Sequence, residues 1–213
     1  MWKIFLDLLF PFTYDQNYLN SLTAEKFLSL TVPAILPPVP NTFSVLNYKN
    51  KLVKKTVWSL KFKNNRQVAK LFAEVIYDNL IEELANLRLT INFNQPILIV
   101  VPLSPRRKRE RGYNQVDLIA REIEEIDQNN FLTYKRNVLK KVKETPQQSH
   151  LKNKQARLVN LSGCFKVANF EVVRNQNIIL LDDVTTTGAT LTEAIKTLKT
   201  AKPKNIICVT LAH

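Results

Sequence analysis

The chain has 213 residues, of which 45% are hydrophobic, so it can bury the core of one domain, or of one domain with a short appendage. It carries 31 Lys and Arg residues against 18 Asp and Glu residues, and the resulting net charge of +13 favours acidic partners such as nucleic acid, phosphorylated ligands or an anionic membrane. An AT-rich genome, which encodes many Lys and Asn residues, would also produce this charge without any such partner.

Composition also argues against membrane insertion, secretion and a zinc site. No stretch approaches the roughly 20 uninterrupted apolar residues of a membrane helix. Residues 2–12 are apolar, but they contain Lys3 and Asp7 and lack a small-residue cleavage site, so we do not expect a signal peptide. The two cysteines, Cys164 and Cys208, suit a reducing compartment and are too few for a four-ligand zinc site. We therefore expect a cytoplasmic protein.

The N-terminal part of the chain differs in pattern from the rest. Residues 1–42 open with an apolar, helix-like segment and end in an extended, proline-stiffened connector at residues 36–40. We interpret them as an N-terminal helical appendage and place the main domain at residues 43–213.

Two helices are predicted at the start of this domain. Residues 48–62 have apolar side chains near helical spacing with lysines between them, which predicts a basic amphipathic helix. Its cationic face is either solvated or a surface for single-stranded DNA, and Tyr48, Trp58 and Phe62 are either core residues or platforms for bases. Residues 66–87 carry a clear apolar stripe at helical spacing and are predicted to form a core-facing helix.

A strongly basic segment follows the first apolar run. Residues 96–101 are continuously apolar and are predicted to be the first buried parallel strand. Ligands of an open α/β sheet bind at the carboxyl ends of its strands, and here a predicted loop with five cations follows. Arginine matches phosphate oxygens well, so this loop would bind a pyrophosphate, a nucleic acid backbone or both, unless it is merely solvated. The candidate pyrophosphate-binding residues are Leu103, Ser104, Arg106, Arg109, Arg111 and Gly112.

The middle of the chain alternates between helical and extended patterns. A helix is predicted over residues 116–126 and short strands over 137–142 and 165–167. The polar segment between these two strands, residues 145–160, has the character of a lid. It contains His150, but a lone histidine in a basic loop is more often solvated than catalytic.

Residues 178–190 are the most informative stretch. Four apolar residues end in Asp182 and Asp183, and a hydroxyl-rich turn with Gly188 leads into a helical pattern at residues 191–200. This pattern predicts a buried parallel strand, a tight loop and a helix N-terminus. With a further apolar strand at residues 205–211 closing the sheet, the alternation predicts an α/β fold with a parallel sheet flanked by helices.

The predicted loop has the chemistry of a ribose-phosphate site. Free N–H groups and the dipole at a helix N-terminus favour a phosphate, and Gly188 allows the backbone to approach it closely. The phosphate candidates are Thr185, Thr186, Thr187, Gly188, Ala189 and Thr190. Asp182 and Asp183 would accept hydrogen bonds from sugar hydroxyls or bind a divalent cation. The alternative is an ordinary helix start after solvated acids, with Thr190 and Glu193 forming a capping box.

Residues 178–190 resemble the phosphoribosyl pyrophosphate signature of type I phosphoribosyltransferases. Over about residues 45–213 the chain resembles the ComF branch of that fold, which is associated with bacterial natural competence. The similarity extends to these residues: Arg111 to Gln115, Lys141, Lys143, Thr145, Gln148, Leu151, Arg157, Asn160 and Gly163 to Phe165.

The resemblance implies a type I phosphoribosyltransferase-like sheet in which Asp182 and Asp183 hold the ribose hydroxyls and the following loop holds the 5'-phosphate. It implies Mg2+ bound through phosphoribosyl pyrophosphate, without a direct protein ligand. It also implies single-stranded DNA and a competence helicase as partners, at the inner face of the membrane. The lid and neighbouring candidates are Lys141, Lys143, Thr145, Gln148, Arg157 and Asn160.

The chain departs from the family pattern in three places: the first 42 residues, Lys141 and Lys143, and Cys164, where alanine is usual. Many relatives carry an N-terminal four-cysteine zinc finger, whereas residues 1–42 contain no cysteine, so we expect no zinc. Lys141 and Lys143 stand where arginine is usual. Thr186 stands where enzymes for 6-oxopurines have an aspartate, which disfavours that reaction because threonine does not take up a proton near neutral pH. No catalytic residue is assigned, and a phosphoribosyltransferase acting on a small nucleophile or nucleobase, without a DNA role, is the alternative function.

Overall fold

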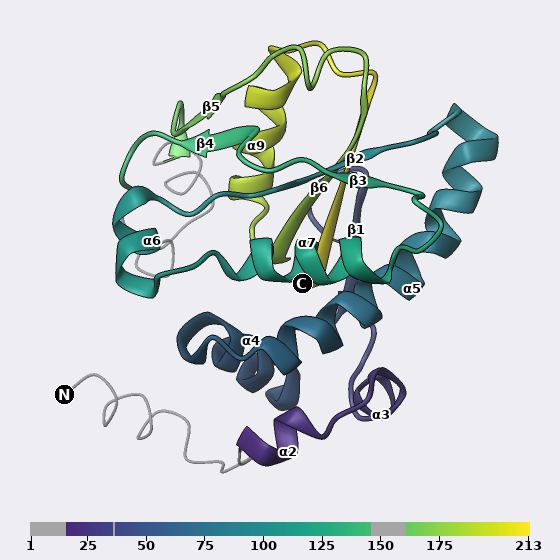
Figure 1. Ribbon diagram of the computed structural model, residues 1–213, viewed down its shortest axis with the longest axis vertical. Coiled ribbons are helices and arrows are strands. Elements are labelled where there is room, and N and C mark those ends of the chain that lie inside the picture. The colour runs from purple at the N-terminus through teal and green to yellow at the C-terminus, as the bar shows by residue number, and fades with distance from the viewer. Residues whose placement is uncertain (1–15, 36, 146–160) are drawn as a thin grey trace.

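The computed structural model of the chain describes residues 16–35, 37–145 and 161–213 (Figure 1). Several sequence predictions lie outside these residues: the apolar segment at residues 2–12, and Gln148, His150, Leu151, Arg157 and Asn160 of the predicted lid.

A five-stranded parallel sheet forms the centre of the molecule, in the order β1-β7-β6-β2-β3. Its strands are β1 (Thr42–Leu46), β2 (Ile97–Val100), β3 (Thr133–Tyr134), β6 (Asn177–Val184) and β7 (Asn205–Ala212). The predicted α/β fold with a parallel sheet flanked by helices is therefore confirmed.

The two edge strands are the part of the sheet that sequence analysis missed. Strand β1 pairs with β7 on one side and has only an isolated antiparallel bridge, from Leu46 to Pro33, among the described residues on the other. It is half-buried along most of its length, so it lacks the continuous apolar run that marked the inner strands. Strand β3 has only two residues. Because β1 lies beyond β7, the last strand is an inner strand and does not close the sheet, and β2 is the second strand in the chain.

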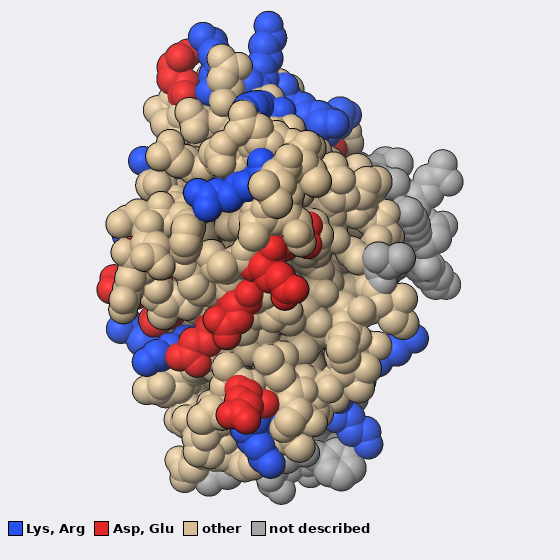
Figure 2. Space-filling model, turned by 90° about the vertical axis from the view of Figure 1, so that its right-hand side faces the viewer, with Lys and Arg blue, Asp and Glu red and all other residues tan. Residues whose placement is uncertain are grey.

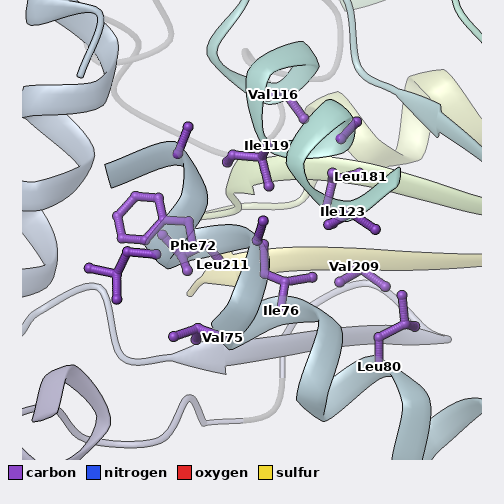
Figure 3. Close-up of a cluster of buried hydrophobic side chains, with 14 of the residues drawn as sticks. Phe72, Val75, Ile76, Leu80, Val116, Ile119, Ile123, Leu181, Val209 and Leu211 are labelled. Atoms are coloured by element: carbon purple, nitrogen blue, oxygen red, sulfur yellow. The ribbon is translucent and has the colours of Figure 1, made fainter. Parts of the chain in front are cut away.

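Two long helices cover one face of the sheet. Helices α5 (Arg66–Ile91) and α7 (Gln115–Ile126) pack against each other and against β6 and β7. Figure 3 shows Phe72 and Ile76 of α5 close to Ile119 of α7, over side chains of β6 and β7. The predicted helices at residues 66–87 and 116–126 are confirmed, since their apolar stripes face this core.

Helix α9 (Ala189–Lys199) covers the opposite face. Leu191 and Leu198 pack there with Leu180 of β6 and with Cys208 of β7, which is buried. Successive side chains of a strand point to opposite faces, so Leu180 belongs to this second core whereas Leu181 belongs to the first. Strand β6 is thus buried on both sides.

The predicted strands at residues 137–142 and 165–167 form a small sheet of their own. Strands β4 (Leu139–Lys141) and β5 (Phe165–Val167) are antiparallel, with Lys141 opposite Phe165. Figure 1 shows this pair beside α9. The small sheet therefore brings Lys141 toward the carboxyl edge of the main sheet.

Three helices from the N-terminal part of the chain add to the face of α5. They are α2 (Gln16–Asn20), α3 (Ala24–Ser29) and α4 (Lys51–Lys63). The ring of Phe27 packs against the ring of Phe72, with centroids 5.9 Å apart. Helix α4 begins three residues later than predicted because the side chain of Asn50 caps it, accepting hydrogen bonds from the N–H groups of Leu52 and Val53.

Charge is unevenly distributed over the surface. Figure 2 shows a diagonal row of Asp and Glu side chains across one face, with Lys and Arg mainly around its periphery. Helix α5 runs on this side in Figure 1 and carries Glu74, Asp78 and Glu82 at four-residue intervals. This face is unsuited to a polyanion, so the excess of 13 positive charges lies mainly elsewhere. None of the described helices is long and apolar enough to span a bilayer.

Candidate functional site

The predicted strand, loop and helix N-terminus are present at residues 177–199. Strand β6 runs through Asp182 and Asp183, both of which are buried, and α9 begins after the loop. Gly188 is the N-cap of α9, with a φ of 76°, and no side chain caps this helix. The capping-box alternative does not hold, because the Glu193 carboxylate accepts a hydrogen bond from the N–H of Gly163 at 2.6 Å.

A cavity of about 220 Å³ lies at the carboxyl end of β6 and of its neighbour β2. Its lining comes from α4, the end of β2, α6, α7, the small sheet, the end of β6 and the start of α9. The lining residues are Lys61, Val101, Pro102, Leu103, Ser104, Arg107, Arg111, Gln115, Val116, Lys141, Thr145, Phe165, Asp182, Asp183, Val184 and Thr190. The two aspartates and the basic segment thus meet on the same side of the sheet.

The basic segment is a helix, α6 (Pro105–Arg111), where a loop was predicted. Ser104 is its N-cap, accepting a hydrogen bond from the N–H of Arg107, and a proline occupies the first helical position. Ser-Pro is a helix-start signal that the sequence analysis overlooked. Side chains four residues apart share a helix face, so Arg107 and Arg111 both line the cavity.

The other residues predicted for the pyrophosphate loop lie farther out. Arg106 pairs with Glu110 at 3.4 Å on the exposed side of α6, and Arg109 is also exposed and absent from the cavity lining. Gly112 ends α6 with a φ of 79° and lines an adjoining cavity. Leu103 and Ser104 do line the cavity of the aspartates.

Of the predicted lid residues that the structure describes, two line the cavity and one lies outside it. Lys141 and Thr145 line the cavity, and the Lys141 ammonium donates to the Thr145 hydroxyl at 2.9 Å. Burial lowers the pKa of Lys141, and the charge of Arg107 adds to this effect, so an anion between the two cations would be stabilised. Lys143 instead donates to the carbonyl oxygen of Ser162 at 3.3 Å, outside the cavity.

The loop before α9 has the features of an anion site. Thr185 is buried and donates its N–H to the carbonyl oxygen of Ala212. The Thr187 hydroxyl is buried, and among the described residues it has no hydrogen-bond partner. A buried hydroxyl without a partner is costly, and a phosphate oxygen at the start of α9 would accept from it. Gly188 has a left-handed conformation at this turn, but the side that a Cβ would occupy is filled by Val39, so the close approach predicted there is made by Val39 and not by an anion.

The adjacent carboxylates differ electrostatically. Burial raises the pKa of Asp182 well above its usual range, and the neighbouring charge of Asp183 raises it further. Burial alone would also raise the pKa of Asp183, but the charge and hydrogen bond of Lys61 and a hydrogen bond from Gln115 outweigh it and lower this pKa. Asp183 is therefore the carboxylate that carries the negative charge.

Residues 111–115, an Arg-Gly-Tyr-Asn-Gln run, hold the surrounding elements together. The Tyr113 hydroxyl donates to the carbonyl oxygen of Leu60 at 2.6 Å and accepts from the N–H of Asn64 at 2.9 Å, which ties the end of α4 to the site. Asn114 caps α7, and its amide donates to the carbonyl oxygen of Val101 at the end of β2.

The ends of the same run reach the carboxylates. The guanidinium of Arg111 donates to the amide oxygen of Gln115 at 3.1 Å, and the amide nitrogen of Gln115 donates to Asp183 at 3.1 Å. Arg111 also lies over the ring of Phe62, 5.0 Å from its centroid. The run thus links the exposed end of α4 to the buried carboxylate.

Sequence analysis missed three polar or charged residues of this cavity as site residues. Gln115 had been noted only as part of the family pattern, and Arg107 only as one cation of a loop. Lys61 had been placed on a solvated or DNA-binding face of its helix, yet it forms an ion pair with Asp183 at 2.7 Å. A helical projection that starts at Asn50 places Lys61 on the face of Val57, which is buried, and this was the available signal.

A family model described as a phosphoribosyl transferase domain matches residues 76–213, which is well over half of the chain. Competence protein F of Haemophilus influenzae is 38% identical over 107 residues, covering 48% of this chain and 43% of that protein. DNA utilization protein YhgH of Salmonella typhimurium is 30% identical over 165 residues, covering 76% of this chain and 67% of that protein.

This chain belongs to the ComF family of phosphoribosyltransferases. The alignment with the Haemophilus member of the ComF family spans less than half of that protein. Among solved structures, hypoxanthine-guanine phosphoribosyl transferase of L. donovani is similar with a TM-score of 0.40 at 15% identity, over 68% of each chain. The match to the phosphoribosyl transferase family model begins inside α5, so α4 and the N-terminal helices precede the matched domain.

Proposed function

We propose that the cavity binds phosphoribosyl pyrophosphate and that the protein acts in the handling of single-stranded DNA during natural transformation. The observation that carries the first part is one cavity that contains twin carboxylates, the start of α9 and four cations from three other elements. No single class of simpler ligand accounts for all three.

Each part of the ligand has a chemical counterpart. Asp182 and Asp183 accept hydrogen bonds from the ribose hydroxyls, and the loop from Thr185 to Thr190, of which Thr190 lines the cavity, binds the 5'-phosphate. Arg107, Arg111 and Lys141 neutralise the pyrophosphate. Mg2+ prefers phosphate oxygens with few carboxylates, so the pyrophosphate would carry the ion into the cavity and the ion would offset its charge.

The DNA part of the proposal is supported by names and by surface chemistry. The relatives above are called a competence protein and a DNA utilization protein. On α4, the ring of Phe62 is 51% exposed and lies 5.6 Å from the ring of Trp58, with Arg111 and Lys63 over the two rings. Exposed rings among cations suit the bases and phosphates of a single strand.

A cationic cavity adjoins the first one. It has a volume of about 670 Å³ and shares Pro102, Leu103 and Lys141 with the aspartate cavity. Its cationic lining residues are Arg66, Lys108, Arg121, Lys135, Arg136, Lys140 and Lys141. A groove of this charge attracts a polyanion, in contrast to the acidic face of Figure 2.

Replacing Arg107 or Arg111 with alanine is expected to weaken binding of phosphoribosyl pyrophosphate with Mg2+ by about tenfold to a hundredfold, since each loses a charge-assisted contact in the cavity. Isothermal titration calorimetry measures this. Arg106→Ala is the matched control on the same helix, because its side chain lies outside the cavity, and it should bind like the wild type. Equal losses in all three variants would mean a general charge effect instead of a site.

Binding of a fluorescent single-stranded oligonucleotide should weaken with salt, with a log-log slope of about -0.7 per phosphate neutralised. The double change Lys135→Ala and Lys140→Ala should reduce this slope by about 1.4, because both lysines line the cationic cavity. The control pair is Lys199→Ala and Lys202→Ala, near the opposite, amino edge of the sheet, and should change it little. A slope near zero in the wild type would remove the DNA role.

Release of pyrophosphate separates this proposal from the second candidate function. An active phosphoribosyltransferase should release pyrophosphate with one member of a panel of small nucleophiles and nucleobases, and DNA should not be required. Phe165 lines the cavity beside Lys141 and offers an apolar surface to such an acceptor. Turnover with an acceptor, together with a flat salt response toward DNA, would favour this function over ours.

A further inference from the structure

Helix α4 contributes a charged residue directly to the ribose-phosphate cavity. The ammonium of Lys61 lies 2.7 Å from a carboxylate oxygen of Asp183, and the two side chains are only 22% and 7% exposed. Helix α4 precedes the segment that matches the phosphoribosyl transferase domain, so this contact comes from outside the matched fold.

The contact is one of three that described residues make to the Asp183 carboxylate, which leaves acceptor capacity for a further donor. One carboxylate oxygen accepts from Lys61 and from Gln115, and the other accepts from the N–H of Val184 at 2.8 Å. The backbone N–H of Asp183 itself donates to Asp182 at 2.9 Å. The position of the Asp183 carboxylate is thus determined by three donors, one of which is charged.

Lys61 is also the cation in direct contact with the Asp183 carboxylate. The cations around the two aspartates are Lys61 from α4, Arg107 and Arg111 from α6 and Lys141 from the small sheet. The Cys208 thiol of β7 faces Asp182, Tyr48 faces Lys61, and Gln115 of α7 is neutral. Only Lys61 forms an ion pair with either aspartate among the described residues. The pKa of Asp182 is already raised by burial, and without a cation in contact burial would raise the pKa of Asp183 as well.

A protonated carboxyl is a poorer partner for a sugar. An ionised carboxylate accepts hydrogen bonds at both oxygens, whereas the protonated form becomes a donor at one of them. Ribose hydroxyls that donate to Asp183 therefore need it ionised. The ammonium of Lys61, on a helix distant in sequence, favours the ionised form of Asp183.

We propose that Lys61 is a positioning residue of the ribose-phosphate site, which keeps Asp183 ionised and oriented to accept hydrogen bonds from the ribose. This inference rests on the proposed function of the cavity. It makes the affinity of the site depend on α4. The neighbour of Lys61 in this helix, Phe62, is exposed at the surface.

The test compares Lys61→Met with the wild type by calorimetric titration with phosphoribosyl pyrophosphate and Mg2+ between pH 6 and pH 9. Lys61→Met should bind at least about tenfold more weakly at pH 7, because a hydrogen bond to a charged group is lost. Without the ammonium, burial raises the pKa of Asp183, so the loss should shrink as pH rises and Asp183 ionises. The wild type should show a flatter profile over this range.

Two variants control for structure. Lys61→Arg keeps the charge and should retain most of the affinity and the flat profile. Lys54→Met makes the same replacement two turns earlier on α4, outside the cavity lining, and should behave like the wild type. Thermal unfolding of each variant checks that it is folded. A Lys61→Met affinity and pH profile equal to those of the wild type would overturn the proposal, and so would tighter binding, which would make Lys61 a competitor of the ribose.

A ligand-free measurement separates this proposal from the function it rests on. NMR titration of 13C-labelled aspartate carboxyls should show Asp183 titrating at higher pH in Lys61→Met than in the wild type. If the wild type binds no phosphoribosyl pyrophosphate, the proposed function fails whatever the titration shows. If the wild type binds and the titration of Asp183 does not move, only the role of Lys61 fails.

Discussion

Asp182→Asn and Asp183→Asn are each expected to abolish measurable binding of phosphoribosyl pyrophosphate, while they change the stability of the protein in opposite directions. Both changes remove a carboxylate that accepts hydrogen bonds from the ribose hydroxyls. Their effects on folding differ because the two carboxylates, although adjacent, have different surroundings.

Asp182→Asn should stabilise the protein by about 0.5–2 kcal/mol near neutral pH. Burial and the charge of Asp183 raise the pKa of Asp182 in the folded state, so its ionisation opposes folding. Such a group contributes stability below its unfolded pKa and loses it as pH rises through the folded pKa. The advantage of asparagine should therefore grow as pH rises.

Asp183→Asn should destabilise the protein by about 1–3 kcal/mol, because it leaves the partly buried ammonium of Lys61 without its ion-pair partner. The pKa of Asp183 is lowered in the folded state, chiefly because the Lys61 charge and hydrogen bond overcome the effect of burial. Its stabilising contribution is present above the unfolded pKa of about 4 and is lost as pH falls. The destabilisation should therefore vanish in acid.

Calorimetry for the ligand and thermal unfolding between pH 4 and pH 8 measure the two effects separately. Glu110→Gln, which removes an exposed carboxylate on α6, is a control that should alter neither. Unchanged affinity in the double variant Asp182→Asn and Asp183→Asn would remove the assignment of the ligand. Destabilisation by both single variants alike would mean that the charge is not concentrated on Asp183.

Gly188→Ala is expected to destabilise the protein by about 2–4 kcal/mol. Gly188 has a φ of 76°, and a left-handed conformation costs a residue with a Cβ roughly 1–2 kcal/mol. A Cβ there would also lie 2.2 Å from a methyl carbon of Val39, which belongs to the Pro-rich connector and is buried. Overpacking of this kind costs about 1–3 kcal/mol.

A double-mutant cycle with Val39→Ala separates the two causes. Val39→Ala removes the clashing methyl carbon, and the nearest other atoms, in Pro38 and Val39 itself, are then 3.4 Å and 3.6 Å from the added Cβ. The two changes should therefore be non-additive by about 1–2 kcal/mol in urea unfolding, with only the conformational cost remaining. Additivity within about 0.5 kcal/mol would show that the connector does not pack against the phosphate loop. Gly112→Ala is the comparison, since it has a similar φ but no atom within 4 Å of the added Cβ.

The sequence alone determined those features that depend on residues contiguous in the chain. The strand, loop and helix start at residues 177–199 are contiguous, and each has a distinct pattern: a fully apolar run, a hydroxyl-rich turn and helical spacing. The inner strands β2, β6 and β7 are apolar on both faces, so they were predictable as parallel strands. The fold class followed from their alternation with the helices.

Only the tertiary structure decided which charged residues reach the cavity. The direction in which each side chain of α6 points depends on where the helix cap lies and on which side of the helix packs inward. The order of the five cations in the chain therefore could not show which of them reach the cavity. Lys61 and Asp183 are far apart in the sequence, and a lysine on a basic helix has the same pattern whether it is solvated or paired. Nothing local distinguishes Asp182 from Asp183. Their difference arises because a single ammonium from α4 contacts one of them, and such a long-range contact exists only once the helix has packed against the sheet.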